Sequence, residues 1–485
     1  MSDKRQKNQP EQLGLAFPAA GRGEAPNAVG QGTETLTAKR VHESPADTER
    51  LMEEVCEREN CLQALRRVKT NKGGPGVDGM TVRDLPIYLK QHWTTIREQL
   101  LNGTYRPQPV KRVEIDKPDG SGVRKLGVPT VLDRFIQQIV LQVLQRRWDS
   151  TFSDHSYGFR PGRSAHQAVA RAQQYVAEGY RWVIDLDLEK FFDRVCHDKL
   201  MAKIAARISD RRVLKLIRAF LAAGVMEGGL VSAVGEGVPQ GGPLSPLLSN
   251  LVLDEWDQEL ERRGHRFVRY ADDSNVYVRT ERAGQRVMAS LTAFITHRLK
   301  LKVNHTKSAV ARPWKRKFLG FSFTIESQPR RRIAPQAVGR FKERVRELTG
   351  RARGVSLPRM VEDLSPYLRG WQGYFGFCQT PSVLRDLEQW LRRRLRAVQW
   401  VHWKHGSRRY AELRKRGVWA EWAAKAASSA HGPWRLAHAK AVKIALPDKF
   451  FDSLGLPRLV APVPLNPPNR RMRTRMSGGV AGVRG

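Results

Sequence analysis

The sequence predicts an α+β fold, because helical patterns and strand patterns occupy different stretches of the chain. Near the N-terminus, apolar residues recur at helical spacing over 51–68 and 85–101, which indicates amphipathic helices. The middle of the chain carries short apolar, β-branched runs at 181–188 and 267–278, a composition typical of strands. From residue 324 to about 442, Arg-rich amphipathic patterns with interleaved tryptophans follow. A strand-containing body followed by an all-helical region is therefore expected.

The first third of the chain alternates between predicted helices and turn-rich loops. Residues 1–47 are rich in Gly, Ala, Pro, Gln and Glu with little periodicity, and we expect them to form a flexible extension. A Gly-rich loop at 71–79 separates the first two helices. The alternation of apolar and polar residues over 110–128 predicts a hairpin turning at 118–120. Apolar residues from 135 to 144 then indicate another amphipathic helix.

Acidic residues interrupt both strand-like runs in the middle of the chain. The run 181–188 contains Asp185 and Asp187. The run 267–278 is interpreted as two strands joined at Ala271-Asp-Asp-Ser274, a hairpin candidate. Charged residues inside otherwise apolar strands are unfavourable in a core, so they indicate a site rather than packing alone.

The charge of the chain indicates a polyanionic partner. Its 485 residues include 85 Lys and Arg against 48 Asp and Glu, a formal charge of +37. Nucleic acid is the obvious partner, because basic side chains release condensed counterions from phosphates; a basic protein that is merely soluble is the alternative. No apolar run reaches the roughly 18–20 residues of a membrane span, and four scattered cysteines favour a reducing cytoplasm.

The paired carboxylates suggest a metal site. Adjacent carboxylates raise each other's pKa unless a cation lies between them. Asp187 at the end of one strand and Asp272-Asp273 on the hairpin together supply oxygen ligands for two Mg²⁺ ions. Such a pair of ions activates an attacking hydroxyl and stabilises the leaving oxygen of a phosphoryl transfer. An isolated Asp-Asp pair is better explained as a turn, since Asp is a common turn residue.

Motifs in a fixed order resemble those of reverse transcriptases. Asp187–Val195 resembles the metal-binding motif, Gly237–Pro246 the intervening motif, and Tyr270-Ala-Asp-Asp273 the YxDD box. Further blocks resemble group II intron reverse transcriptases, also called maturases: Lys72–Gly79, Gly127–Arg134, Tyr157–Ser164, Leu299–Ser308, Phe318–Phe321 and Gly370–Gly376. The resemblance runs from about residue 51 to 410 and is closest to the compact bacterial class C members.

The resemblance implies a right-hand polymerase, with fingers and a palm built on an antiparallel sheet, followed by an all-α thumb or maturase X domain. The implied parts are a flexible N-terminal extension (1–47), an N-terminal loop region and fingers (48–180), a palm with the catalytic site (181–325), a thumb or X domain (326–410), and a basic C-terminal nucleic-acid-binding region and tail (411–485).

The resemblance also assigns the metal ligands. Asp187 is implied as the first ligand, in preference to Asp185, which lies two residues earlier on the same strand face. Asp272 is implied as the second ligand, with Asp273 nearby. The backbone carbonyl of Leu188 is a further oxygen ligand, since Mg²⁺ takes oxygen donors.

Residues that contact the incoming deoxynucleoside triphosphate are implied in the same way. Phe192, five residues after Asp187, matches an aromatic that excludes a 2′-hydroxyl, with core packing as its alternative. The remaining nucleotide-binding residues implied are polar or cationic: Lys111, Lys117, Arg124, Gln240 and Lys307. Each of the cations is otherwise explained as a solvated surface charge. Arg160 and Arg163 are expected either to meet template phosphate or to buttress the fingers.

The stretch 391–416 contains ten Lys and Arg against Glu412 alone, with three tryptophans at or beside it. This one-sided charge favours a grip on the nucleic-acid backbone, although a solvated charged helix is the alternative and some of the tryptophans are expected in the core. The predicted nucleic-acid-binding residues here are Arg392, Arg393, Arg394, Arg396 and Lys404. No Cys-x-x-Cys pair exists, so no zinc-stabilised endonuclease is expected.

The sequence and the resemblance together predict an RNA-directed DNA polymerase of a group II intron that also binds its intron RNA for splicing. The expected partners are intron RNA, template RNA with a DNA primer, target DNA and deoxynucleoside triphosphates, in a bacterial cytoplasm, at the nucleoid during integration. Two alternatives remain open: a host-domesticated enzyme for defence, repair or diversity generation, and a non-catalytic maturase that acts as an RNA chaperone.

Overall fold

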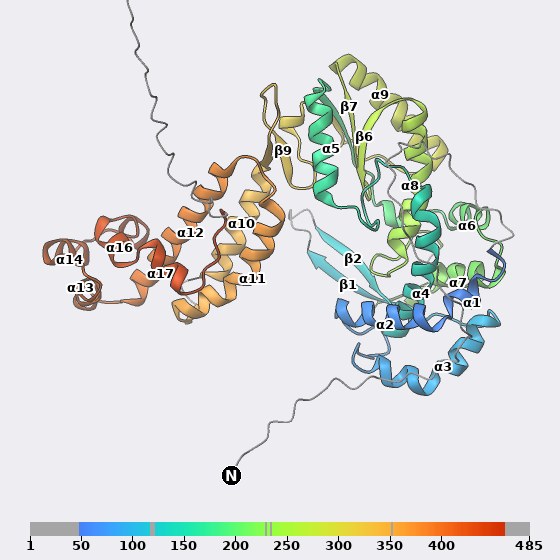
Figure 1. Ribbon diagram of the computed structural model, residues 1–485, viewed down its shortest axis with the longest axis horizontal. Coiled ribbons are helices and arrows are strands. Elements are labelled where there is room, and N and C mark those ends of the chain that lie inside the picture. The colour runs from blue at the N-terminus through green and yellow to red at the C-terminus, as the bar shows by residue number, and fades with distance from the viewer. Residues whose placement is uncertain (1–47, 117–121, 228–229, 233–234, 351–352, 461–485) are drawn as a thin grey trace, which may run out of the picture. The chain divides into compact units, whose positions relative to one another are not determined.

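A computed structural model of the chain describes residues 48–116, 122–227, 230–232, 235–350 and 353–460. The chain forms two compact units, which divide between Pro329 and Arg330 (Figure 1). Each unit has a hydrophobic core of its own. The predicted α+β fold is confirmed, because strands form two sheets in the first unit and helices dominate the second.

The helices of the first unit begin at recognisable signals in the sequence. The hydroxyl of Thr130 accepts a hydrogen bond from the Asp133 amide at 3.0 Å and starts α4, and Ser164 with Gln167 forms a capping box at the start of α5. The longer helices of this unit are α1 (Leu51–Val55), α2 (Arg58–Asn71), α3 (Leu85–Leu101), α4 (Val131–Trp148), α5 (Ala165–Ala177), α6 (His197–Ala205), α7 (Arg211–Ala222), α8 (Ser245–Arg262) and α9 (Glu281–Phe294).

The first sheet has the strand order β2-β1-β4-β5. β1 (Val110–Asp116) and β2 (Val123–Val128) pair antiparallel, so the predicted hairpin is confirmed, while its turn at 117–121 lies outside the described residues. β4 (Val225–Glu227) runs parallel to β1 and antiparallel to β5 (Leu230–Ser232). A backbone hydrogen bond at the end of this sheet joins two of the predicted motifs, Gly127–Arg134 and Gly237–Pro246. The Gly127 amide donates to the Gln240 carbonyl at 2.8 Å.

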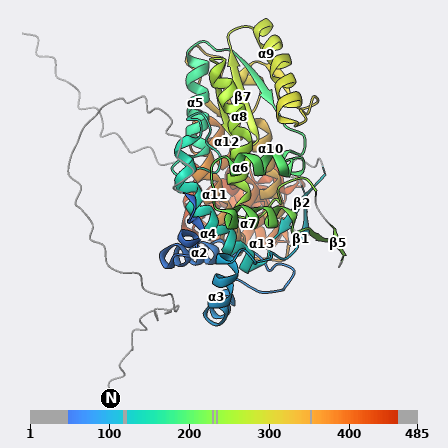
Figure 2. The same cartoon turned by 90° about the vertical axis from the view of Figure 1, so that its right-hand side faces the viewer.

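The second sheet is fully antiparallel, with the order β6-β7-β3-β8. Its strands are β6 (Arg266–Tyr270), β7 (Asp273–Val278), β3 (Trp182–Leu186) and β8 (Ala309–Ala311). Helices α5 and α9 lie beside this sheet in both views (Figures 1 and 2). Both predicted strand runs with internal carboxylates are therefore neighbours in one sheet.

The second unit is helical after the short strand β10 (Arg331–Ile333). Its helices are α10 (Pro335–Leu348), α11 (Leu357–Phe375), α12 (Pro381–His402), α13 (Gly406–Lys415), α14 (Ala420–Ala427), α15 (Pro433–Leu436), α16 (Lys440–Ala445) and α17 (Asp448–Ser453). Trp400 and Trp403 are 1% and 2% exposed, which confirms that some tryptophans of the basic stretch belong to the core. Among the described helices, none combines the length and apolar character needed to cross a bilayer.

Candidate active site

The hairpin of β6 and β7 has a two-residue turn. Tyr270 pairs with Asp273, so only Ala271 and Asp272 form the connection. Ala271 has φ = 57°, a left-handed conformation that residues other than glycine adopt only where neighbours hold them. The sequence predicted a turn through Ser274, and this is corrected: Asp273 already belongs to β7, because two residues suffice to connect antiparallel strands.

β3 lies directly alongside the hairpin of β6 and β7. It pairs antiparallel with β7, with Leu186 opposite Ser274. One step further along this register, Asp187 lies next to Asp273, and Asp272 precedes Asp273 in the turn. The structure therefore brings together the three carboxylates that the sequence singled out.

The backbone of Asp187 is fixed on both sides by a turn far away in sequence. Its amide donates to the Ser308 hydroxyl at 3.0 Å, and its carbonyl accepts from the Asn304 amide at 2.8 Å. Leu188 continues this arrangement by bridging to Val303. The block 299–308, which resembles a palm motif of the group II intron reverse transcriptases, thus holds Asp187, the first candidate metal ligand, in place.

The site is strongly electronegative. Burial, together with the charges of Asp185, Asp272 and Asp187, raises the pKa of Asp273 to about 8, and Lys317 opposes these effects. Carboxylates that raise one another's pKa in this way are stabilised in their charged form by a nearby cation. The arrangement is therefore suited to binding cations.

The donor set fits Mg²⁺ when substrate phosphates complete the coordination. Within the described residues, no group of three or more His, Cys, Asp or Glu side chains forms a ready-made metal cage. Mg²⁺ is normally held by one or two carboxylates together with waters and substrate phosphates rather than by such a cage. Asp187, Asp272 and Asp273, with the Leu188 carbonyl, are the residues of this chain that would hold it.

Asp185, the second choice for a metal ligand, has another partner. Its carboxylate is 15% exposed and accepts from Arg316 Nε at 2.8 Å and from Nη2 at 2.5 Å. Burial raises the pKa of Asp185, and the adjacent guanidinium opposes that effect. The ion pair favours Asp187 over Asp185 as the ligand.

Phe192 and the Gly-Pro loop contact each other through their backbones. Phe192 lies in a short 3₁₀ helix, Phe191–Asp193, and its side chain is partly exposed. Its carbonyl accepts from the Val238 amide at 2.7 Å. The loop can approach this closely because Gly237 has φ = 96° and a Cβ there would lie 2.9 Å from that carbonyl. Gln240, in the same loop, is partly exposed.

The predicted nucleotide-binding cations are placed unequally. Lys111 is exposed on β1, opposite Val128, and Lys307 is exposed in the turn that holds Asp187. Lys117 lies outside the described residues, and of Arg124 only the backbone, in β2, is described. The roles of these four residues stay predictions.

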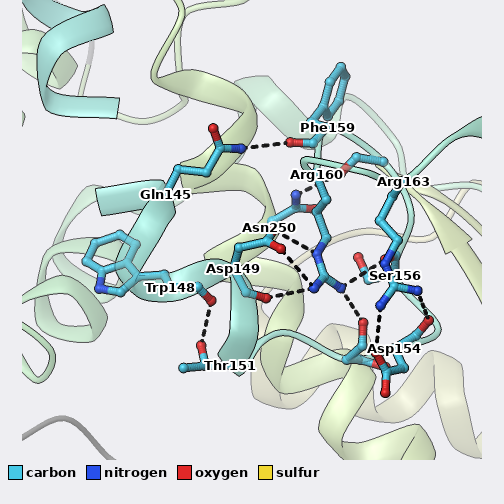
Figure 3. Close-up of polar contacts among 12 residues, drawn as sticks. Gln145, Trp148, Asp149, Thr151, Asp154, Ser156, Phe159, Arg160, Arg163 and Asn250 are labelled. Atoms are coloured by element: carbon cyan, nitrogen blue, oxygen red, sulfur yellow. Dashed lines mark hydrogen bonds and ion pairs between the residues drawn. The ribbon is translucent and has the colours of Figure 1, made fainter. Parts of the chain in front are cut away.

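Arg160 is a structural residue of the fingers loop (Figure 3). It is 7% exposed and donates to Asp149 Oδ1 at 3.0 Å and to the carbonyls of Ser153 and Ser156 at 2.5 and 3.0 Å. Of the two roles expected from the sequence, buttressing fits this burial and phosphate contact does not. Arg163 is more accessible and pairs with Asp154 at 2.6 Å.

Two of the predicted nucleic-acid-binding arginines are buried in the second unit, and the prediction for them is corrected. Arg392 is 2% exposed and donates to Glu388 at 2.8 Å and to Asp452 at 3.0 Å. Arg396 is 7% exposed and pairs with Asp448 at 2.7 Å. Both side chains join α12 to the region around α17, because carboxylates of that region supply their partners.

The other basic residues of α12 are more accessible. Arg393 is partly exposed, lies 4.2 Å from the Trp434 ring centroid, and donates to the Trp434 carbonyl. Arg394 donates to the Thr349 hydroxyl. Lys404 is exposed just after the helix ends. Arg393 and Lys404 are thus the members of the predicted set that nucleic acid can reach most easily.

Sequence reasoning missed three residues that support the site: Arg269, Ser308 and Arg316. Arg269 is fully buried beside the catalytic turn. The available signal was that Arg269 follows two apolar residues within the strand 266–270, because a buried charge requires a partner. Ser308 and Arg316 act across more than 120 residues of chain, so no local pattern could have identified their partners, even though Ser308 lies in the block 299–308.

Comparison with known proteins agrees with these features. Residues 115–323 match the family model described as reverse transcriptase (RNA-dependent DNA polymerase). Residues 338–417 match the group II intron, maturase-specific domain. The matches fall in the first and second unit respectively.

Curated relatives are similar over part of their length. Protein YkfC of Escherichia coli is 40% identical over 221 residues, which are 44% of this chain and 58% of that protein. The group II intron-encoded protein LtrA of Lactococcus lactis is 36% identical over 195 residues, 40% of this chain and 32% of LtrA. The similarity therefore spans about a third to three fifths of these relatives.

Solved structures are similar at a lower level. A chain of a Cas6-RT-Cas1–Cas2 complex is 24% identical with a TM-score of 0.34, covering 51% of this chain and 42% of that one. Telomerase from Candida albicans is 13% identical with a TM-score of 0.38, covering 64% of each chain. The two family models, in this order along the chain, show that it carries a reverse transcriptase domain followed by a group II intron maturase-specific domain.

Proposed function

We propose that the protein is an RNA-directed DNA polymerase that copies intron RNA into DNA and also binds that RNA as a maturase. The observation that carries the proposal is the β3–β7 register, which sets Asp187 beside Asp273, next to Asp272 in the turn. Neighbouring carboxylates supply the oxygen ligands that two-metal nucleotidyl transfer requires.

The chain's own contribution to catalysis is positioning and electrostatics, as expected for phosphoryl transfer. Asp187, Asp272 and Asp273 would hold two Mg²⁺ ions, which would supply neutralisation of the triphosphate charge and activation of the primer 3′-hydroxyl. Ser308 and Asn304 fix the backbone of Asp187. Phe192 presents a partly exposed ring beside the loop of Gln240, where it would contact the sugar and exclude a 2′-hydroxyl.

Binding of nucleic acid is assigned to the charge of the whole chain and to the accessible cations of the second unit. A formal charge of +37 favours phosphate backbones by counterion release. Arg393 and Lys404 are accessible in the second unit. The proposed partners are group II intron RNA, template RNA with a DNA primer, target DNA and deoxynucleoside triphosphates, in a bacterial cytoplasm and at the nucleoid during integration.

The test is primer extension with the variant Asp272→Ala. We expect no DNA synthesis on an RNA template, while affinity for intron RNA and assisted splicing stay at the wild-type level. Asp198→Ala is the matched control, because Asp198 is 82% exposed and pairs with Arg218; it should leave synthesis unchanged. Synthesis that persists in Asp272→Ala would refute the site.

A wild-type protein that binds the intron RNA and assists splicing but extends no primer would favour the RNA chaperone alternative. A host-domesticated enzyme would be indicated if the flanking DNA lacks intron domains V and VI. Each outcome contradicts a different part of the proposal. The first would show that the protein is not a polymerase, and the second would show that intron RNA is not its partner.

A further inference from the structure

Arg269 is a charged residue in the interior of the first unit. It directly precedes Tyr270 on β6, and its side chain is 0% exposed. Its guanidinium donates five hydrogen bonds, to Asp257 Oδ1 and Oδ2 at 2.7 and 2.5 Å, Asn250 Oδ1 at 3.0 Å, Ser156 Oγ at 2.7 Å and the Ala271 carbonyl at 2.9 Å. All five N–H donors of the guanidinium therefore have an acceptor.

One of these bonds reaches the turn of the catalytic hairpin. The acceptor is the carbonyl of Ala271, whose φ of 57° is unfavourable for a residue with a Cβ. Such conformations persist where the surroundings determine them, and they cluster at functional sites. Arg269 thus holds the strained residue that immediately precedes Asp272.

The fingers loop supports the same turn from its other side. A Cβ at Gly158 would lie 2.2 Å from the Ala271 amide nitrogen, so only glycine allows this approach. The Gly158 carbonyl accepts from Asn250 Nδ2 at 2.9 Å. Asn250, drawn in Figure 3 with the fingers loop, therefore binds both Gly158 and Arg269.

The same loop also pairs with β6 along its backbone. The Arg269 amide donates to the His155 carbonyl at 2.9 Å, and the Arg269 carbonyl accepts from Tyr157 at 2.9 Å. The fingers loop, α8 and the hairpin of β6 and β7 consequently meet at one guanidinium.

A buried ion pair of this kind adds little net stability, because desolvation of both charges offsets their attraction. The planar, forked guanidinium instead fixes the positions of its partners, since each N–H of arginine points at a defined acceptor. A role in geometry therefore accounts for the pair better than a role in stability.

We propose that the Arg269–Asp257 pair is a positioning unit that locks the Ala271 turn against Gly158 and so orients Asp272 and Asp273 toward the metal ions. The inference rests on the proposed function, because it takes the hairpin as the metal site. It adds that the fingers loop, through Ser156 and Gly158, contributes to the geometry of carboxylates in the palm.

The test compares Arg269→Lys with the control Asp254→Asn in the full-length protein. Lysine keeps the charge but loses the fork. Asp254 is a buried carboxylate of the same helix as Asp257, and its partner Arg207 lies 3.0 Å away. The control thus perturbs a neighbouring buried ion pair on the same helix.

Three measurements separate positioning from stability. Mn²⁺ affinity, followed by electron paramagnetic resonance without nucleotide, should fall about 10-fold in Arg269→Lys. The kcat of primer extension should fall about 10- to 100-fold, with KM for the nucleotide within about 3-fold of wild type. Amide hydrogen exchange at 271–274 should accelerate. Asp254→Asn should match Arg269→Lys in thermal destabilisation while showing none of these changes.

Ser156→Ala is a milder variant in case Arg269→Lys does not fold. It removes one bond to Arg269 without leaving a charge unpaired, and we expect the same three changes at about 3-fold size. The inference would be overturned if Arg269→Lys, or Ser156→Ala in case the lysine variant is unfolded, kept the wild-type Mn²⁺ affinity and exchange rates. It would also be overturned if Asp254→Asn lost as much Mn²⁺ affinity and kcat as Arg269→Lys. Failure of the polymerase proposal is distinguishable, because wild type would then extend no primer whereas hydrogen exchange would still report on the turn.

Discussion

Arg316 and Asp185 form a two-bond ion pair inside the acidic site, with both hydrogen bonds, at 2.8 and 2.5 Å, ending on the same carboxylate oxygen. The same guanidinium also donates to the Lys307 carbonyl at 2.6 Å. Asp185 is therefore neutralised by the protein itself, while Asp187, two residues later, is held through its backbone by the hydrogen bonds that the described residues make. This difference separates two aspartates that the sequence alone could rank only by resemblance.

The first prediction concerns these two residues. Asp187→Asn should lower the rate of primer extension by about 1,000-fold or more, since metal-held charge is worth several kcal/mol in the transition state. Asp185→Asn keeps the shape and an acceptor for Arg316, so we expect a loss within about 10-fold. Single-turnover extension of a DNA primer on RNA measures both. A dead Asp185→Asn beside an active Asp187→Asn would reverse the ligand assignment.

The second prediction concerns selection against ribonucleotides. Phe192→Val should raise kcat/KM for ribonucleotides relative to deoxynucleotides by about 10- to 100-fold, because a smaller side chain leaves room for a 2′-hydroxyl. Incorporation of deoxycytidine and cytidine triphosphates opposite guanine measures the ratio. Phe191→Leu is the control: Phe191 is 2% exposed and packs against Phe192 with ring centroids 5.2 Å apart. If both variants change the ratio equally, core packing rather than contact with the sugar explains Phe192.

The third prediction separates neighbouring arginines on α12. Arg392→Met should lower the free energy of unfolding by about 3 kcal/mol, because it leaves Glu388 and Asp452 without their buried partner. Arg393→Gln should change it by less than about 1 kcal/mol, yet weaken RNA binding and reduce the salt slope of log Kd by about 1. Urea denaturation and RNA titrations at several salt concentrations test both. A salt slope that falls only in Arg392→Met would contradict this assignment.

The sequence predicted most of the elements that build the site but not the contacts that hold it. Alternation and turn residues located β1 with β2 and β6 with β7, since these pairings are local. The partnership of β3 with β7 joins residues about 90 positions apart, and only the order of motifs suggested it. Helical spacing likewise located α12, because its apolar stripe repeats at the helical period.

Burial of individual arginines was beyond sequence reasoning. Arg392 and Arg396 lie on the same helix as Arg393, and charge alone makes the three equivalent. What distinguishes them is the carboxylates supplied by Asp448 and Asp452 from another helix. Tertiary contacts determine which arginines form buried ion pairs. The number of basic residues in a stretch therefore overestimates the number that RNA can contact.

The fourth prediction concerns stability at acid pH and the contribution of one arginine, Arg212, which joins α7 to α1. Arg212 donates to both oxygens of Glu53 at 2.9 and 2.7 Å and to Asp210 at 2.9 Å. The hydrogen bonds from Arg212 hold the pKa of Glu53 below its ordinary value of 4.5. The pKa of Asp210 is also lowered: burial raises it, but the bonds from Arg212 and the Met52 amide outweigh that effect.

Because both folded-state pKa values are depressed, the pairs stabilise the protein fully above about pH 5 and lose that effect as the pH falls through the folded values. Arg212→Leu should therefore lower the free energy of unfolding by about 2 kcal/mol at pH 7, and the difference from wild type should shrink below pH 4. Urea denaturation between pH 7 and 3 measures it. Arg218→Leu is the control, since its partner Asp198 is 82% exposed and its ion pair should contribute little at any pH. A constant difference between Arg212→Leu and wild type across this range would mean that lost packing, not the ion pairs, causes the destabilisation.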